Sequence, residues 1–240
     1  MIENKNTFNI KIADLVVKIN AMNEYSLKKC IDYTTDGNIL PDITAKTTSL
    51  EIVEEKKLGE TTFSDAYCEF VCLYRSIAEQ LPAYGGMVFH GAAVETGGKA
   101  YIFTAPSGTG KSTHIKLWMD VLGEQVRVIN GDKPVLRKKG GEFFVYSTPW
   151  AGKEGWHNNI SAPLKAICLI RRGKENKIYP ISPSEYFDEI MGQVYVPKDS
   201  EAWLKTLSLI DELAQNTDFY LLECDISEDA AKLSFETLTK

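Results

Sequence analysis

The sequence is short of basic residues and of long apolar runs. Lys and Arg number 27 against 33 Asp and Glu, which gives a formal net charge of −6 and argues against bulk binding to nucleic acid or to an anionic membrane. No apolar run approaches the roughly 18 to 20 residues that a membrane span requires, and no basic-then-apolar leader opens the chain. We therefore expect a cytoplasmic protein that binds neither nucleic acid nor membrane.

Cysteine is scarce as well. The five cysteines are odd in number, scattered and mostly embedded in apolar sequence, which favours reduced core thiols over a disulfide framework. Cys68 and Cys72 lie one helical turn apart, but the sequence offers no second Cys or His pair to complete a metal site with them. Neither a disulfide scaffold nor a cysteine metal centre is expected.

The remaining composition is that of a globular protein. With 240 residues, 44% of them apolar and 25% charged, the chain can bury a substantial core. Apolar and polar residues partly alternate over 8–19, a turn signal stands at 35–38, and residues 43–53 include many β-branched residues. This pattern predicts antiparallel β structure. We expect a β-rich N-terminal segment, residues 1–62, packed on a core formed by residues 63–240.

The core segment alternates predicted strands and helices. Ser64 can cap a helix whose apolar residues recur at spacings of three and four until Pro82 ends it. Two short strands joined by a Gly-Gly turn at 97–98 lead into a small-residue loop, and a helix over about 111–122 follows. Further strands are predicted at 126–129, 135–137, 142–146, 166–170, 177–181 and 219–224, and further helices at 184–191, 200–214 and from Ser227. This order predicts an α/β protein.

Residues 101–113, Tyr-Ile-Phe-Thr-Ala-Pro-Ser-Gly-Thr-Gly-Lys-Ser-Thr, place a strand, a loop and a helix start in the order of a phosphate-binding loop. Free amides at the helix start can hold phosphate oxygens, while Lys111 reaches the terminal phosphates and Ser112 holds Mg²⁺. Ala105 stands at the first glycine of the G-x-x-x-x-G-K-[ST] pattern and fits if its φ is negative. The alternative is a glycine-rich turn without a ligand. We expect ATP and Mg²⁺ to bind through Ser107, Gly108, Thr109, Gly110, Lys111, Ser112 and Thr113.

Asp132 is the candidate acidic residue. Phosphoryl transfer needs a triphosphate held in place, a divalent ion, and an acidic group that positions the ion or the nucleophile. Asp132 follows the predicted strand 126–129, at the strand end where open α/β sheets place their ligands. We expect it to lie near the phosphate loop and to share the metal with Ser112. The alternative is a turn in which Asp132 only caps the chain locally.

Two more segments carry candidate ligand-binding residues. The stretch 147–159 has no periodicity, which is typical of a functional loop; Trp150 could stack on a base or substrate ring, and Lys153 could reach a phosphate. The alternative is a surface loop anchored by one buried Trp. Arg171, with Arg172 beside it, follows the predicted strand 166–170 and could supply positive charge to phosphate oxygens, although charged residues after strands are common.

These motifs together resemble the catalytic core of HPr kinase/phosphorylase and of the wider phosphoenolpyruvate-carboxykinase-like group of P-loop kinases. The resemblance rests on His90-Gly91-Ala92-Ala93-Val94, on 105–113 and on Ile129-Asn130-Gly131-Asp132, and it covers roughly residues 88–150. Ser147-Thr148-Pro149-Trp150-Ala151-Gly152-Lys153-Glu154-Gly155 similarly resembles a Pro-Trp-x-Gly-Lys loop of HPr-kinase-like proteins. The N-terminal domain of HPr kinase/phosphorylase is not recognisable in residues 1–60.

The resemblance implies a mixed sheet and a nucleotide-dependent kinase in which Lys111 and Ser112 serve the phosphates and magnesium. It also implies that His90 supports the acidic site from a neighbouring strand. In that family the strand after the phosphate helix usually ends in two consecutive aspartates, whereas Gly131 stands first here, so Asp132 does both jobs or the acid/base group comes from elsewhere. If His90 donates to Asp132, it lowers the carboxylate pKa and fixes its orientation; the alternative is a buried histidine bonded to backbone.

The leading hypothesis is an ATP-dependent kinase that transfers the γ-phosphate to a hydroxyl, either a Ser or Thr of a peptide or protein or a hydroxyl of a small molecule. A second hypothesis is a nucleotide-binding sensor or scaffold without phosphotransfer, which Gly131 favours. A carboxykinase acting on oxaloacetate is disfavoured because the chain is short. The sequence leaves the oligomeric state open, a homo-oligomer included.

Overall fold

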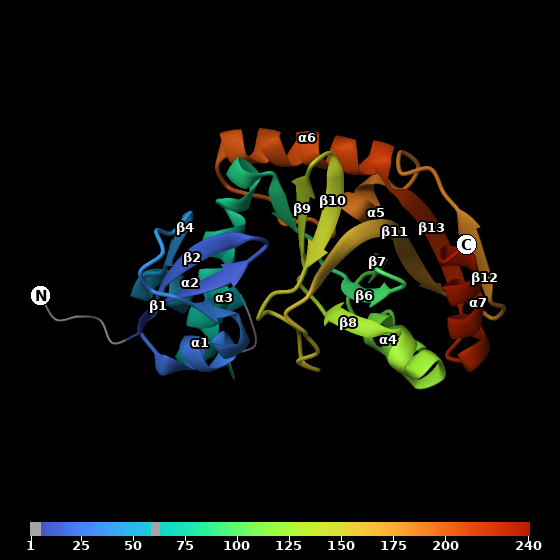
Figure 1. Cartoon of the computed structure of the whole chain (residues 1–240), viewed down its shortest axis with the longest axis horizontal. Coiled ribbons are helices and arrows are strands. Elements are labelled where there is room, and N and C mark those ends of the chain that lie inside the picture. Colours follow the sequence, from blue (N-terminus) through green and yellow to red (C-terminus); the bar gives the residue numbers. More distant parts are fainter. Residues whose placement is uncertain (1–5, 59–62) are drawn as a thin grey trace, which may run out of the picture.

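The computed structural model describes residues 6–58 and 63–240, which form a smaller N-terminal unit beside a larger curved sheet (Figure 1). The strands are β1 (Thr7–Ile12), β2 (Leu15–Asn20), β3 (Thr34–Thr35), β4 (Ile43–Lys46), β5 (Gly86–Val88), β6 (Ala92–Thr96), β7 (Lys99–Thr104), β8 (Arg127–Asn130), β9 (Val135–Lys139), β10 (Glu142–Tyr146), β11 (Ser161–Arg172), β12 (Lys177–Pro180) and β13 (Asp218–Cys224). The α-helices are α1 (Glu24–Lys29), α2 (Ser49–Leu58), α3 (Asp65–Ala78), α4 (Lys111–Leu122), α5 (Phe187–Met191), α6 (Ser200–Asn216) and α7 (Glu228–Leu238). The fold is therefore mixed α/β.

The N-terminal unit is built on a four-stranded sheet in the order β3-β1-β2-β4. β1 and β2 pair antiparallel, whereas β4 runs parallel to β2. The core of this sheet continues into α3, because Phe70, Leu73 and Ile77 belong to the same apolar cluster as Ile10 and Val17. This apolar cluster also includes Val88, Val135 and Tyr146 of the larger sheet, so α3 packs between the N-terminal strands and that sheet.

The expectation of purely antiparallel β structure in this unit is wrong. Only Ile43–Lys46 of the stretch 43–53 is a strand, and α2 begins at Ser49. A capping box starts that helix: the Glu51 side chain accepts from the Thr48 N–H at 2.7 Å, and the Glu51 N–H donates to Thr48 Oγ1 at 3.3 Å. The β-branched residues of 43–53 predicted a strand, although the capping box at Thr48 and Glu51 indicates a helix start. Residues 1–5 and 59–62 of the segment lie outside the described residues.

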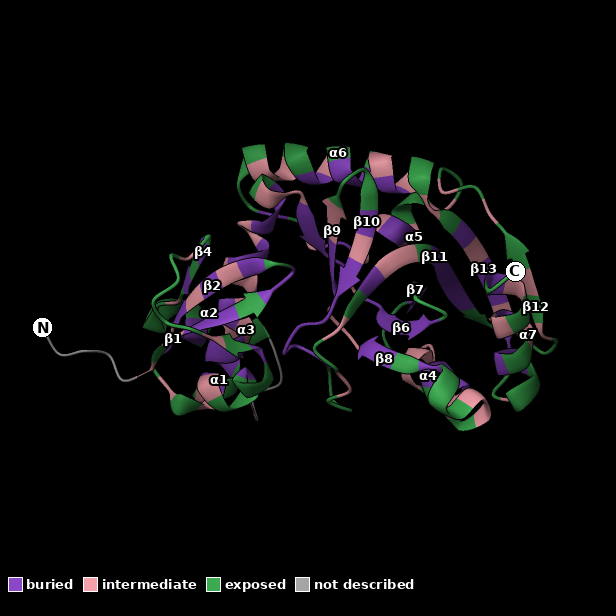
Figure 2. Cartoon of the chain, in the orientation of Figure 1, coloured by how far each residue is buried: buried purple, intermediate pink, exposed green. Residues whose placement is uncertain are grey.

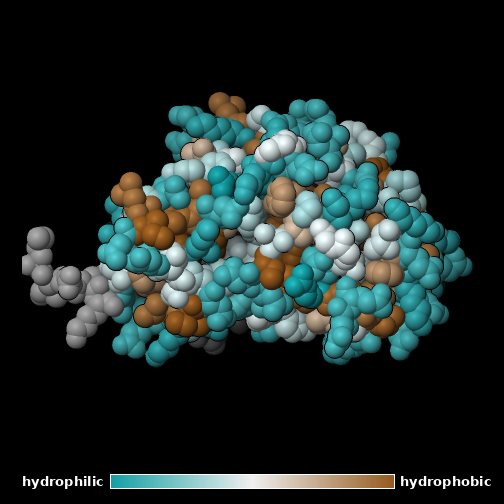
Figure 3. Space-filling view, viewed as in Figure 1, coloured by the Kyte–Doolittle hydropathy of each residue, from teal (hydrophilic) through white to brown (hydrophobic). Residues whose placement is uncertain are grey.

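The surface of the N-terminal unit carries many apolar side chains. Figure 3 shows apolar patches over this part of the molecule. The large apolar residues of residues 6–58 that are exposed are Met22, Ile31, Ile39, Leu40, Leu50, Val53 and Leu58. Three of them lie on α2, whose only buried residue is Ile52. α2 therefore owes its position to its capping box and to α3 more than to an apolar face of its own.

The larger sheet has nine strands and is mixed, as the sequence resemblance implied. Its main order is β5-β9-β10-β11-β7-β6-β8, with β13 also beside β11 and β12 beside β13. β11 is long enough to join both halves, pairing antiparallel with β10 at its start and parallel with β7 and β13 further on. The strand that the sequence predicted at 177–181 pairs with β13 and not with β11.

Helices lie over both faces of this sheet, and β6, most of β7 and the middle of β11 are buried (Figure 2). Along β7, Tyr101 and Phe103 face the cluster under α4 and α7, and Ile102 faces the opposite cluster under α5 and α6. This two-residue alternation explains why β7 reads as a continuous apolar run. It also places the end of β7, where the phosphate loop begins, at the rim of a rigid layer.

Side chains cap α3, α6 and α7, and the sequence predicted the first of these caps, at Ser64. Ser64 accepts from the Tyr67 N–H, Asp199 from the Ala202 N–H, and Ser227 caps α7. All five cysteines are free and buried. Within the described ranges, none of the helices has the length and apolar character needed to cross a membrane.

Candidate active site

The predicted phosphate loop joins the end of β7 to the start of α4. Gly108 and Gly110 have φ values of 78° and 127°, a region that glycine adopts without strain. Ala105 does not have a positive φ, which is the condition for an alanine at that place in the pattern. Gly110 caps α4 without a side-chain hydrogen bond, so no capping side chain takes up the first amides of the helix.

Side chains hold this loop in place by donating hydrogen bonds to its backbone carbonyl groups. Lys111 Nζ donates to the Ala105 carbonyl at 2.8 Å. Arg172 donates from Nη2 to the Gly108 carbonyl at 2.7 Å and from Nε to the Thr109 carbonyl at 3.2 Å. The Thr109 N–H also donates to the Pro106 carbonyl at 3.3 Å, so the loop is held by bonds within itself as well as by Lys111 and Arg172.

The arginine that contacts the loop is Arg172, not the predicted Arg171. Arg171 forms an ion pair with Glu189 at 2.5 Å and lies over the Tyr186 ring, 5.2 Å from its centroid. Successive side chains of a strand point to opposite faces, and β11 includes both residues, so only one of the two lies on the face from which the loop is reached. The sequence prediction named Arg171, with Arg172 beside it.

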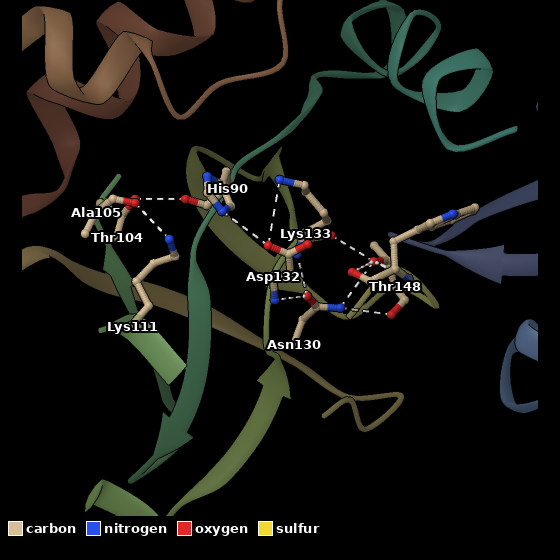
Figure 4. A network of polar contacts seen from close by, with 9 residues as sticks. His90, Thr104, Ala105, Lys111, Asn130, Asp132, Lys133 and Thr148 are labelled. Carbon is tan, nitrogen blue, oxygen red and sulfur yellow. Dashed lines mark hydrogen bonds and ion pairs between the residues drawn. The ribbon is translucent and has the colours of Figure 1, made fainter. Parts of the chain in front are cut away.

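A polar network fixes the turn that follows β8. Asn130 Oδ1 accepts from the N–H groups of Asp132 and Lys133 at 2.9 and 2.7 Å. Asn130 Nδ2 donates to the Thr148 carbonyl at 2.9 Å, and Thr148 Oγ1 donates to the Lys133 carbonyl at 2.8 Å (Figure 4). Asn130 is fully buried. Sequence reasoning missed it, although an Asn opening a tight turn is a recognised signal.

His90 lies against Asp132. Its Nε2 is 3.2 Å from Asp132 Oδ1, and its backbone is anchored by the bond from the His90 N–H to the Gln193 carbonyl at 2.6 Å. The next residue, Gly91, donates its N–H to the Asp132 carbonyl at 3.0 Å. The link between β5 and β6 is thereby tied to the end of β8, and the imidazole is aimed at the carboxylate.

The charges around Asp132 keep it ionised. Burial raises its pKa, but the hydrogen bond from His90 and the charges of Lys133, His90 and Lys111 outweigh this, so the net pKa is below the ordinary value. Burial lowers the pKa of Lys111, the Asp132 charge raises it in part, and the Lys133 charge lowers it further. The structure thus brings His90, Lys111 and Asp132 together at one end of the sheet.

Lys133 is a site residue that sequence reasoning did not single out. Its Nζ is 3.8 Å from Asp132 Oδ1. Burial lowers its pKa, and the Asp132 charge opposes that shift only in part. Its one sequence signal was its place directly after Asp132 at the end of a strand.

A side chain at Gly131 would be crowded by the backbone of the loop after β10. Its N–H donates to the Trp156 carbonyl at 2.8 Å. A Cβ at this position would lie 3.2 Å from the Ala151 carbonyl and 3.4 Å from the Trp156 carbonyl. The loop after β10 therefore occupies the space, and Asp132 is the only member of the Asn130–Lys133 turn that can offer a carboxylate here.

Trp150 does not face the phosphate loop. It is 7% exposed, its indole stacks on Phe70 with centroids 4.9 Å apart, and its Nε1–H donates to the Phe70 carbonyl at 2.9 Å. The base-stacking prediction thus gives way to the alternative of a loop anchored by a buried Trp, because the apolar cluster of the N-terminal unit receives the ring. Lys153 lies on the exposed tip 152–155.

The residues fit a magnesium ion that is shared with phosphates. Within 6–58 and 63–240, no group of three or more His, Cys, Asp or Glu side chains is placed to hold a metal. Mg²⁺ commonly takes one or two protein oxygens, substrate phosphates and waters. Ser112 at the start of α4 and the ionised Asp132 are donors of that type, and they are the two that the sequence indicated.

A cavity of about 200 Å³ adjoins the loop. It is lined by Thr104, Ala105, Pro106, Thr109, Leu169, Ile170, Arg171, Arg172, Glu189 and Gln193. Its walls come from the ends of β7 and β11 and from the region of α5. Gln193 Oε1 is buried and has no hydrogen-bond partner among the described residues. There is room next to the phosphate loop for part of a nucleotide or an acceptor.

Comparison with known proteins identifies the family of this chain. A search of curated proteins gave no match. Among solved structures, the HPr(Ser) kinase/phosphatase from Coxiella burnetii matches with 8% sequence identity and a TM-score of 0.36, over 64% of this chain and 99% of that chain; a TM-score of this size carries no argument about activity. The family model described as SynChlorMet cassette protein ScmC matches residues 64–229, well over half of the chain. The chain belongs to the SynChlorMet cassette protein ScmC family.

Proposed function

We propose that the chain is an ATP-dependent kinase that transfers the γ-phosphate to a hydroxyl group. The acceptor is a Ser or Thr of a peptide or protein, or a hydroxyl of a small molecule. One observation carries the proposal: the Asp132 carboxylate, bonded by His90 at 3.2 Å, lies close enough to Lys111 in the first turn of α4 for the two charges to act on each other. The glycine-containing loop that precedes that turn ends at Gly110, which caps α4 without a side-chain hydrogen bond.

Each group has a role in this reaction. The amides of 107–113 and the Lys111 ammonium hold the polyphosphate, as catalysis of phosphoryl transfer is mostly positioning and charge stabilisation. Ser112 and Asp132 would hold Mg²⁺, which neutralises charge on the phosphates. Because the Asp132 pKa is below its ordinary value, the carboxylate stays ionised at neutral pH and suits holding the metal and orienting the acceptor hydroxyl. His90 fixes the rotation of that carboxylate.

One specific observation favours the sensor or scaffold alternative. Gly131 is packed against the Ala151 and Trp156 carbonyls, so only one carboxylate of this turn faces the loop. If that single group cannot both hold the metal and accept the hydroxyl proton, nucleotide would bind without being turned over. The two functions differ in whether ADP is released when an acceptor is offered.

The test combines nucleotide binding with turnover. Melting temperature is measured with Mg-ATP, and ADP release is measured with a Ser/Thr peptide library and with serine and glycerol. We expect Lys111→Met to abolish the ATP-dependent rise in melting temperature. We expect Asp132→Asn to keep much of that rise and to lower ADP release by about 100-fold or more.

Two controls lie on the same helix as Lys111. Lys116 and Asp120 pair with each other at 2.6 Å on the exposed side of α4, so Lys116→Met and Asp120→Asn should leave binding and turnover unchanged. Absence of any shift with a magnesium nucleotide in the wild type would overturn the proposal. Firm ATP binding with no ADP release for any acceptor would favour the sensor.

A further inference from the structure

Lys133 is held more firmly than a surface lysine. Its N–H donates to Asn130 Oδ1 at 2.7 Å, and its carbonyl accepts from Thr148 Oγ1 at 2.8 Å. Both partners are buried. The backbone of Lys133 is therefore fixed on both sides, and the direction of its side chain follows from the same turn that sets Asp132.

The Lys133 ammonium is partly desolvated and poorly compensated. Its side chain is 28% exposed, and its one ion pair among the described residues is with Asp132 Oδ1 at 3.8 Å, which is beyond hydrogen-bond distance. His90 lies nearer to that same oxygen, at 3.2 Å. Charges taken out of water without close partners are unfavourable. The surroundings of the Lys133 ammonium group therefore favour the binding of an anion.

Lys133 and Lys111 act on the same space. Figure 4 shows the contacts of His90 and Lys133 converging on Asp132, with Lys111 nearby at the start of α4 and bonded to the Ala105 carbonyl. The charges of Lys133 and Lys111 both act on the one carboxylate of Asp132, so these three residues together carry net positive charge before any ligand arrives. Such a cluster suits a group with several negative oxygens.

We propose that Lys133 binds the transferring phosphoryl group of the nucleotide, opposite Lys111. This inference rests on the proposed kinase function. In the reaction, the bond between the γ-phosphorus and its bridging oxygen breaks, the acceptor oxygen bonds to phosphorus, and ADP leaves with the bridging electrons. The acceptor proton goes to Asp132 or to water. Lys133 keeps its own protons and donates hydrogen bonds to the peripheral oxygens, as a point charge.

The experiment separates ATP from ADP. ADP lacks the phosphoryl group that Lys133 would contact. We expect Lys133→Met to weaken Mg-ATP binding about 10-fold and Mg-ADP binding less than 2-fold, a difference that one charge-assisted contact can supply. Both dissociation constants are measured by calorimetry. Lys133→Arg keeps the charge and should keep most of the preference for ATP, and Lys133→Gln serves as a second neutral variant if the Met variant does not fold.

The matched control is Lys165, which pairs with Asp218 at 2.6 Å near the other end of the sheet. Lys165→Met should change neither dissociation constant. Equal weakening of ATP and ADP by both neutral variants would mean that Lys133 only supports the turn, and the inference would fail. Unchanged ATP binding in both would also overturn it while leaving the kinase proposal intact. A wild type that binds no nucleotide would overturn both.

Discussion

The phosphate loop and the loop 147–160 are both glycine-containing connections beside Asp132, yet they are built in opposite ways. In the phosphate loop, residues 106–108 are exposed, and the loop is tied to its neighbour β11 through the carbonyls that Arg172 reaches. In the second loop, residues 147–151 are all buried. Ser147, Thr148 and Trp150 each bond to groups far away in the chain.

This difference separates an exposed loop from a buried, supporting one. The first loop has small residues at its exposed positions 106–108, as the proposed binding of phosphates requires. The second uses polar groups of its buried first half internally, and its exposed residues are the tip 152–155 and residues 158–159. Its main contribution to the site is to hold Asn130, Gly131 and the strand end that presents Asp132. A loop without periodicity can thus serve function by packing alone.

The largest expected effect is on stability, from removing the anchor of the second loop. Trp150→Ala should lower the free energy of unfolding by about 3–5 kcal/mol, since it empties a buried aromatic site and removes a hydrogen bond to Phe70. Urea unfolding measures this change. Glu154→Ala, on the exposed tip, is the control and should change stability by no more than about 0.5 kcal/mol. Similar losses of unfolding free energy in the two variants would show that Trp150 anchors the loop no more than the exposed tip does.

Sequence reasoning is strongest where the physics is local. The helix predicted over 111–122, where the structure has α4, and the strand before Asp132 follow from residue types that act over a few positions. It could not place Trp150, because Phe70 lies 80 residues away in the chain and only the tertiary fold brings them together. It named Arg171, whereas Arg172 contacts the loop, because the face on which each side chain of β11 lies depends on the whole sheet. α2 was missed although its capping box is local, since β-branched composition was given more weight.

A second prediction concerns the helix behind the phosphate loop. His114 of α4 is 3% exposed, with Nε2 3.0 Å from Ser234 Oγ and with Nδ1 lacking a partner among the described residues. Burial lowers its pKa from 6.5 to about 4. The folded pKa lies below the unfolded one, so this contribution to stability is full above pH 6.5 and is lost as the pH falls toward 4.

Between pH 8 and pH 5 the wild type should lose about 2 kcal/mol of unfolding free energy through His114. His114→Gln, which cannot gain a proton, should show a flatter curve by about that amount. Urea unfolding at the two pH values provides the comparison. Parallel curves for the two proteins would show that His114 does not carry the pH dependence of the unfolding free energy. The buried position in α4 would then tolerate a charge.

The smallest effect tests how the N-terminal unit is joined to the second loop. Ser147 Oγ donates to the Ile129 carbonyl at 2.6 Å, which leaves the Tyr33 hydroxyl to donate to Ser147 Oγ, also at 2.6 Å. Tyr33→Phe and Ser147→Ala should each lower the free energy of unfolding by about 1 kcal/mol, with a coupling of similar size in the double variant. Strictly additive losses would show that the two hydroxyls act independently. Coupling would show that the N-terminal unit built on β1 and β2 helps to hold β8, the strand that presents Asp132.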